Sequence, residues 1–272
     1  MQNFSVSPKE MVACVWRNRG LVKALVQREV VGRYRGSFIG IVWSFLNPML
    51  MLAVYTFVFS VVFKARWNAG SESKTEFALV LFAGLIVFNL FAECMNRAPG
   101  LILSNLNYVK KVVFPLEILP AVALGSALFH ACISVGVWLL AYMVFFGVPH
   151  LTVLLLPLVA LPLLLLSIGL SWMLASLGVY LRDVSQFIGL LVTALMFMSP
   201  IFFPASSLPE NYRYLLLLNP LTPVIEQARD ILYWGKLPDT TVWLACLLGS
   251  SLVAWFGFAW FQKTRKGFAD VL

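Results

Sequence analysis

Charge is scarce in this 272-residue chain, and one long stretch has none. Charged residues make up 12% of the sequence and hydrophobic residues 61%, whereas a soluble domain carries roughly 25% charge. Residues 118–181 contain no Asp, Glu, Lys or Arg. A helix needs about 20 apolar residues to cross a bilayer, so this stretch is long enough for two crossings joined by a turn at residues 146–150. The composition excludes a soluble domain of this size and predicts an all-α membrane protein.

The chain also lacks the motifs of nucleotide hydrolysis and of common hydrolases. It contains no G-x-x-x-x-G-K-[ST], no H-E-x-x-H and no G-x-S-x-G, so we expect neither a P-loop ATPase nor another enzyme. The four cysteines are far apart and form no C-x-x-C pair, which argues against a disulfide framework and a metal site. We expect no cofactor bound to the chain itself.

Few polar groups interrupt the apolar runs. His130 lies inside a predicted span, and Glu93 and Glu117 lie at span ends. A proton relay through the membrane needs a chain of ionisable partners, so we interpret the histidine as packing against a neighbouring helix. We interpret both glutamates as ordinary interfacial charges, which leaves no ion-coupling site.

Six apolar segments predict six transmembrane helices in a single membrane domain, residues 1–272. The second segment is short, because sixteen uncharged residues rise only about 24 Å. The predicted spans are residues 37–63, 77–95, 117–146, 151–181, 184–203 and 240–262.

Basic residues orient these spans. With both termini on one side of the membrane, 14 of the 20 Lys and Arg residues fall on that side and six on the other. Cytoplasmic loops carry an excess of Lys and Arg, so we expect the N- and C-termini in the cytoplasm. Residues 1–36 combine apolar and basic positions, which predicts an amphipathic helix in the cytoplasmic headgroup layer. The alternative is a charged segment that only orients the first span.

Prolines are dense between the fifth and sixth spans. Pro200, Pro204, Pro220 and Pro223 border apolar patches that are each too short to cross a membrane. Non-helical backbone survives at membrane depth only where it is buried in protein or lines a cavity. We therefore predict two re-entrant half-helices within residues 200–223 that dip in from the outer side. The alternative is an extracytoplasmic loop.

Several short strings, taken in order, resemble one family of transporters. They are RYRGSFIGIVW at 33–43 followed by Asn47-Pro48, NYVKKVVFPLEILP at 107–120, YLRDV at 180–184, SPIFFP at 199–204 and NPLTP at 219–223. Each is weak alone, but the ordered set resembles the membrane subunits of ABC-2 type polysaccharide exporters, which are the permeases for O-antigen, capsule and teichoic acid. The resemblance runs from about Leu25 to the C-terminus and is strongest to the O-antigen type.

The resemblance implies a bacterial inner-membrane permease that exports undecaprenyl-pyrophosphate-linked O-antigen polysaccharide. Such a permease works as a homodimer with two copies of a separate ABC ATPase, which bind the ATP, and it has no nucleic-acid partner. Residues 96–115 would form a coupling loop seated on the ATPase, and residues 182–183 a second, smaller contact. The residues implied in coupling are Asn96, Asn105, Asn107, Lys110, Lys111, Arg182 and Asp183.

The resemblance also assigns the two ends of the transport path. The N-terminal helix would lie where the lipid-linked diphosphate enters, and Arg28, Arg33 and Arg35 would bind it through charge-assisted hydrogen bonds. Plain anchoring of the first span explains the same arginines equally well. The re-entrant half-helices would form the outer gate. The gate residues are Pro200, Phe202, Phe203, Pro220 and Pro223.

A path for a long polar glycan needs side chains that hold sugars loosely. Aromatic rings stack on the apolar faces of sugars and still let them slide. The first span offers Trp43, Tyr55 and Phe59, and the fifth offers Phe187 and Phe197, so we predict that these five line the substrate channel. The alternative is that they pack against lipid or neighbouring helices, as most aromatic residues in a membrane bundle do.

Three other functions are alternatives to O-antigen export, and the sequence argues against the second, whose candidate groups are too sparse, and against the third. The first is export of capsular polysaccharide or teichoic acid by the same type of permease. The second is a membrane enzyme acting on lipid-linked sugars, which needs acid and base groups on the outer side, where only Glu210, Glu226, Arg229 and Asp230 are candidates. The third is a secondary carrier, which is typically built from internal repeats, and the sequence has no visible repeat.

Overall fold

The computed structural model describes residues 5–62, 67, 74–109, 114–207, 211, 216 and 218–272, and every regular element in them is a helix. The α-helices are α1 Pro8–Arg17, α2 Arg19–Tyr34, α3 Trp43–Tyr55, α4 Lys74–Arg97, α5 Leu106–Val109, α6 Leu119–Phe146, α7 Leu156–Tyr180, α8 Val184–Phe197, α10 Thr222–Arg229, α11 Thr240–Thr264 and α12 Phe268–Val271. Short 3-10 segments are η1 Gly40–Val42, η3 Ala98–Gly100, η4 Leu103–Asn105, η5 Leu116–Ile118, η6 Leu151–Leu155, η7 Ala205–Ser207 and η9 Arg265–Gly267, and η2 Thr56–Val62 and η8 Asp230–Trp234 are π-helical.

Five helical stretches among the described residues are long and apolar enough to cross a membrane. They are Gly40–Phe59, Thr75–Gly100, Leu116–Phe146, Leu151–Tyr180 and Thr240–Gly267. The predicted all-α membrane fold is therefore confirmed, and these five coincide with five of the six predicted spans. The predicted fifth span is a shorter apolar helix, α8, which ends at Phe197 before the turn at Ser199 and Pro200.

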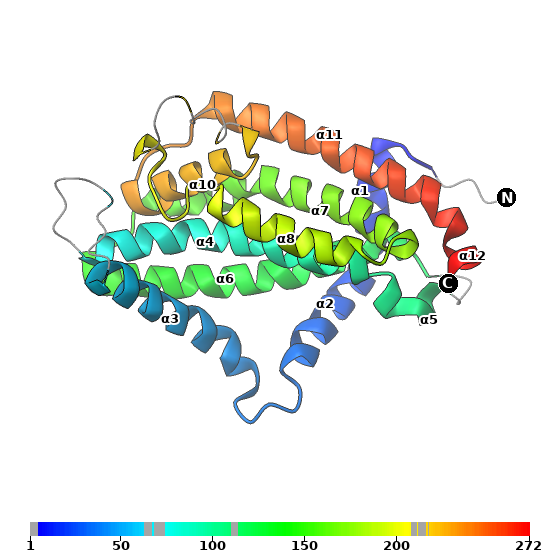
Figure 1. Ribbon diagram of the computed structural model, residues 1–272, viewed down its shortest axis with the longest axis horizontal. Coiled ribbons are helices and arrows are strands. Elements are labelled where there is room, and N and C mark those ends of the chain that lie inside the picture. Colours follow the sequence, from blue (N-terminus) through cyan, green and yellow to red (C-terminus); the bar gives the residue numbers. More distant parts are fainter. Residues whose placement is uncertain are drawn as a thin grey trace.

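Helix α4 forms the centre of the bundle. It is in contact with α3, α6, α7, α8 and α10, and its apolar face packs in one cluster with residues of α7, α8 and α10. The Trp138 indole of α6 donates a hydrogen bond to the Leu79 carbonyl of α4 at 2.8 Å. In Figure 1 α4, α6, α7, α8 and α11 run side by side, whereas α2 and α3 leave them and meet in a V at the loop that joins them.

Helices α7 and α11 approach to backbone contact, because glycines meet there. A Cβ atom added to Gly257 would lie 2.0 Å from the Gly169 carbonyl oxygen, and one added to Gly169 would lie 2.6 Å from the Cα of Ala254. Small residues let membrane helices approach to backbone contact, where van der Waals packing drives association. A similar contact between Gly178 and Pro99 seats η3, the turn after α4, on α7.

The predicted N-terminal amphipathic segment is divided into two helices at Asn18. Helix α1 begins at the Ser7 cap, whose hydroxyl accepts a hydrogen bond from the Glu10 N–H at 3.2 Å. Its apolar face, including Cys14, packs into a cluster with Trp172 of α7 and Phe258 of α11. Helix α2 packs against α6. Both helices are therefore attached to the ends of membrane spans.

The first and last helices of the chain lie at the same end of the bundle. Helices α1 and α12 lie there together with α5 (Figure 1). Glu117, predicted as an interfacial charge, is buried at this end and pairs with Arg265 at 2.6 Å. The predicted topology, with both termini in the cytoplasm, stays a prediction.

The α7–α11 contact generates a first prediction. Gly257→Ala should lower the free energy of unfolding by about 1–3 kcal/mol, because the new methyl group overpacks a backbone contact. Gly249→Ala on the same helix is the matched control, since no atom lies within 4 Å of its added Cβ. Thermal unfolding of the detergent-solubilised protein measures both changes, and equal melting temperatures would contradict the close contact.

Candidate functional site

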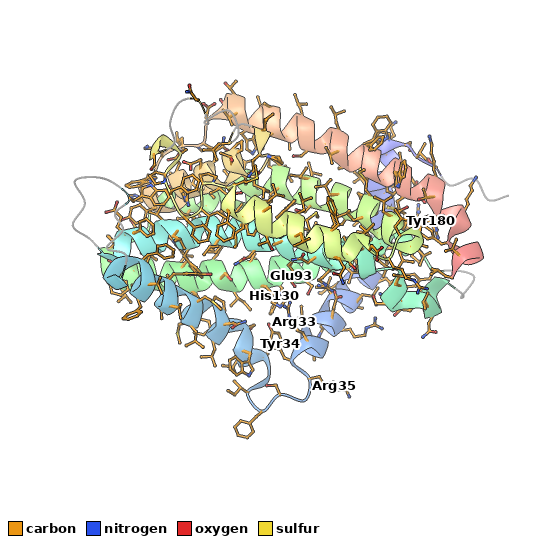
Figure 2. All side chains as sticks on the ribbon, in the orientation of Figure 1. Arg33, Tyr34, Arg35, Glu93, His130 and Tyr180 are labelled. Atoms are coloured by element: carbon orange, nitrogen blue, oxygen red, sulfur yellow. The ribbon has the colours of Figure 1, made fainter. Side chains whose placement is uncertain are left out.

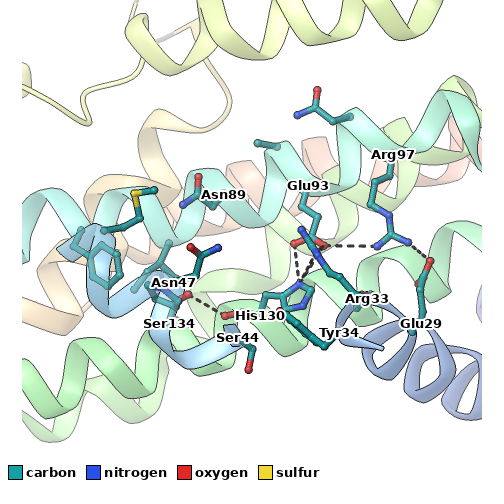
Figure 3. A pocket seen from close by; sticks show the side chains of 18 of the residues that line it. Glu29, Arg33, Tyr34, Ser44, Asn47, Asn89, Glu93, Arg97, His130 and Ser134 are labelled. Atoms are coloured by element: carbon teal, nitrogen blue, oxygen red, sulfur yellow. Dashed lines mark hydrogen bonds and ion pairs between the residues drawn. The ribbon is translucent and has the colours of Figure 1, made fainter. Parts of the chain in front are cut away.

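A cavity of about 850 Å³ lies between α2, α3, α4 and α6. One face of each helix lines it: Phe82, Ile86, Asn89, Glu93 and Arg97 of α4 recur at intervals of three or four residues, which is the spacing of one helical face. The same periodicity relates Ser126, His130 and Ser134 on α6. Figure 3 shows polar side chains from all four helices converging on this space. The cavity therefore offers a polar interior within an otherwise apolar bundle.

A network of charges closes one end of the cavity. Glu93 of α4 binds Arg33 of α2 at 2.6 Å and the His130 Nδ1 of α6 at 3.0 Å. Arg97 lies 3.7 Å from the same carboxylate and forms a second ion pair with Glu29. The dashed lines in Figure 3 follow these contacts. The network joins the N-terminal helix α2 to two membrane helices.

Sequence reasoning missed this network. It interpreted His130 as packing because no carboxylate partner was visible, and it interpreted Glu93 as an interfacial charge. The structure supplies the partner by placing α4 beside α6. A signal was present: Asn89 and Glu93 of the predicted span 77–95, and Arg97 just after it, lie four residues apart, which is the spacing of a polar helical stripe.

The three arginines predicted to bind the diphosphate are not gathered at one point. Only Arg33 lines the cavity. Arg28 donates a hydrogen bond to the Tyr108 hydroxyl at 2.9 Å, which ties α2 to the predicted coupling loop, and Arg35 is exposed in the loop after α2, away from Glu93 and His130 (Figure 2). Tyr34 also lines the cavity, and burial raises the pKa of its phenol, so its hydroxyl remains a hydrogen-bond donor.

Four of the predicted channel and gate residues meet in what we call the aromatic row. Tyr55 and Phe59 of the first span have ring centroids 6.5 Å apart, Phe59 lies 6.0 Å from Phe202, and Phe202 lies 5.8 Å from Phe197 of α8. The row therefore joins the first span, the turn after α8 and α8 itself. The other two predicted channel residues, Trp43 and Phe187, are exposed outside this row.

Arg229 anchors the turn that carries the predicted gate. It is only 1% exposed, and its guanidinium donates to the carbonyls of Val80, Pro200 and Ile201. Gly84 of α4 provides the space, because a Cβ there would lie 2.8 Å from Arg229 Nη2. Sequence reasoning counted this arginine among outer-loop charges. The structure instead makes it a buried tie between α10, α4 and the turn after α8.

The two proline-containing strings of the predicted gate are also joined directly. The Asn219 amide donates to the Ser199 hydroxyl at 2.8 Å and accepts from the Leu221 N–H at 3.0 Å. Among the gate residues, Phe203 and Pro223 are half-buried and Pro220 is exposed. Helix α10 continues from here and is buried against α4 and α7. Whether this segment opens and closes the path stays a prediction.

The five predicted coupling residues that the structure describes do not form one continuous surface. Asn96 lines the cavity, Asn105 donates to the Leu101 carbonyl at 2.9 Å, and Asn107 is exposed. Lys110 and Lys111 lie outside the described residues. Arg182 and Asp183 are exposed in the short turn between α7 and α8.

The Arg229 anchor generates a second prediction. Arg229→Met should destabilise the protein by about 3 kcal/mol or more, because buried carbonyl groups then lack hydrogen-bond donors. Lys236→Met is the control: this lysine is exposed and lies 3.7 Å from Asp230, so its loss should change stability by no more than about 0.5 kcal/mol. Thermal unfolding in detergent compares the two, and similar melting temperatures would show that the anchor contributes little.

The chain is similar to one transporter family and to several export and transport proteins. Residues 20–233 match the family described as ABC-2 type transporter, a range that contains the cavity, the aromatic row and Arg229. The chain is 31% identical over 262 residues to the O-antigen export system permease protein RfbA of Myxococcus xanthus, covering 96% of this chain and 98% of that protein. It is 24% identical to RfbA of Klebsiella pneumoniae, over 93% and 95% of the two chains. It is 28% identical to the polysialic acid transport protein KpsM of Escherichia coli, over 80% and 83%.

Proposed function

We infer the function of this chain from its family, because the chain belongs to the ABC-2 type transporters. It is the membrane permease subunit of a polysaccharide exporter and not an enzyme. The observation that carries this conclusion is its similarity, over almost its whole length, to permeases named for O-antigen export. The cargo that this similarity favours is an O-antigen polysaccharide linked to undecaprenyl pyrophosphate, moved outward across a bacterial inner membrane.

A separate ATPase supplies the energy in this proposal. The sequence has no P-loop, so two ATPase copies bind ATP and drive two permease copies. The exposed turn at Arg182 and Asp183 supports a contact with that subunit, because it lies at the end of the bundle that carries both chain ends. The charge distribution of the loops supports a cytoplasmic location for this end. Residues 96–115 provide the larger coupling surface.

A homodimer is supported by the exposure of the first span. Helix α3 contacts α4 and α6 over part of its surface only, and large apolar side chains such as Met49, Leu50 and Val54 are about half-exposed. A second copy of the chain would cover such a face. The glycan path then runs along the aromatic row and leaves through the segment at residues 200–223, with Trp43 and Phe187 as further lining positions.

Export of a capsular polysaccharide is the second candidate, favoured by the similarity to the polysialic acid transport protein of Escherichia coli. A membrane enzyme is not favoured. Of its four candidate outer-side groups, Arg229 is occupied in holding backbone carbonyls, and Glu226 pairs with it at 3.2 Å. Glu210 lies outside the described residues.

Removal of the gene from its host tests the proposed function. Surface polysaccharide should be lost, lipid-linked polysaccharide should accumulate inside the cell, and a plasmid copy should restore export. The purified chain should hydrolyse ATP only together with its partner ATPase. Normal surface polysaccharide in the deletion strain would contradict the proposal.

The aromatic row generates a separate prediction. Phe59→Leu and Phe197→Leu should each reduce export about threefold to tenfold, because each removes ring contacts worth roughly 0.5–1.5 kcal/mol, while leucine still packs well in a membrane helix. Phe256→Leu is the matched control, since this phenylalanine is exposed on α11 and outside the row.

Measurement of surface polysaccharide at equal protein levels, with co-purification of the ATPase, separates transport from assembly. If all three variants export equally, the row has a packing role only. If Phe59→Leu or Phe197→Leu prevents assembly with the ATPase, the loss of export reflects folding and the row is not assigned to the path.

A further inference from the structure

Two amides of the central helix face the cavity, Asn96 near the end of α4 and Asn89 within a run that is otherwise buried. From residue 76 to residue 91 every α4 residue is buried except Asn89, which is exposed. Asn89 lies near the middle of the span Thr75–Gly100. Another exposed amide, Asn47 of α3, lines the same cavity, and Figure 3 shows the side chains of Asn47 and Asn89 at this space. These two amides at membrane depth call for hydrogen-bond partners.

These amides have no such partner among the described residues. The other neutral side chains that line the cavity, by contrast, include hydroxyls already bonded to backbone: Ser44 donates to the Ile41 carbonyl and Ser134 to the His130 carbonyl. An asparagine amide offers two donors and one acceptor oxygen. Both amides are therefore available to a ligand that carries hydroxyl groups.

The charged groups of the cavity cancel in pairs. Arg33 is paired with Glu93, and Arg97 with Glu29. With each arginine paired to a carboxylate, the cavity has no unpaired positive charge to attract a strongly anionic group. The interior therefore suits a neutral ligand with many hydroxyl groups better than it suits a diphosphate.

Aromatic rings complete the lining. Tyr34, Tyr55 and Phe82 border the cavity, and its volume of about 850 Å³ is within the range of small-molecule pockets, about 300–1,000 Å³. A pyranose presents hydroxyls around its rim and apolar C–H groups on its faces. Amides at the rim positions and rings on the faces match both parts of such a ligand.

Arg33 marks the boundary between this interior and the cytoplasmic side. Its side chain is 54% exposed and binds Glu93 through Nη1. A guanidinium has five N–H donors, so the exposed donors can bind phosphate oxygens while the ion pair persists. A sugar attached to a diphosphate at this point would reach into the cavity.

We propose that this cavity binds the neutral sugar residues next to the diphosphate of the lipid-linked cargo, and that Asn47 and Asn89 are its specificity-determining residues. The proposal rests on the proposed function as an exporter of a lipid-linked polysaccharide. It adds the part of the cargo that is recognised and the side chains that recognise it. Recognition of a short neutral saccharide would let one permease accept chains of different length.

The test compares two lipids on the complex of permease and ATPase in nanodiscs. Radiolabelled undecaprenyl pyrophosphate is one probe, and the same lipid carrying a neutral disaccharide is the other. The parent should bind the sugar-bearing lipid about tenfold more tightly, which is the effect of one or two neutral hydrogen bonds. Asn47→Leu with Asn89→Leu should reduce this ratio to about one without changing the Kd of the bare lipid.

Three further variants keep the test decisive. Cys132→Leu replaces an exposed α6 side chain outside the cavity and should retain the parent ratio. Asn89→Leu alone is compared with Asn89→Gln, which preserves the amide and should restore part of the preference, in case the double variant does not fold. A melting temperature and a dimer mass equal to those of the parent establish that the fold and assembly persist.

Each contrary outcome has a distinct meaning. If the parent binds neither lipid, the proposed function fails. If it binds both lipids equally, or if the double variant keeps the preference, the sugar site is wrong and the proposed function stands. Loss of bare-lipid binding in the double variant would assign the cavity to the diphosphate, and loss of the dimer would assign the two amides to the subunit interface. Either result overturns the sugar site.

Discussion

Arg229 donates hydrogen bonds to three backbone carbonyls, and two of them, those of Pro200 and Ile201, belong to a turn outside any helix. In a bilayer there is no water to complete the bonding of a broken helix, so irregular backbone requires donors from the protein itself. Helix α8 ends at Phe197, and the turn that follows is accepted because one guanidinium holds it against α4. The absence of a side chain at Gly84 gives that guanidinium its space.

The need to pair polar groups within the protein also governs the opposite end of the bundle. Charges at one end of the cavity are satisfied by one another across α2, α4 and α6, which attaches the N-terminal helix α2 to two membrane helices. From residue 76 to residue 91, every residue of α4 is buried except Asn89. An exporter of a polar glycan needs such a position, because a path for hydroxyl groups must cross the most apolar part of the protein.

The aromatic row connects the two halves of the proposed path. Phe59 and Phe197 were predicted as channel residues and Phe202 as a gate residue, from separate strings of the sequence. The structure brings their rings within 6.0 Å of one another in succession. A channel lining and a gate that share one stack of rings cannot move independently, since displacing the turn after α8 removes contacts from the first span. Transport and closure are then coupled through packing.

The sequence by itself determined the class of the fold, the positions of the membrane helices and the family. Those properties depend on local hydrophobicity, on helical periodicity and on short strings, all of which can be read without knowing which helices are neighbours. The pairing of Glu93 with His130, the buried position of Arg229 and the exposure of Asn89 within a buried run of α4 were decided only by the tertiary structure. A polar residue in an apolar run looks the same whether it faces lipid, a neighbouring helix or a cavity. Its role depends on contacts between residues far apart in the chain, as with Arg229 and Val80, and packing of the whole bundle selects those contacts.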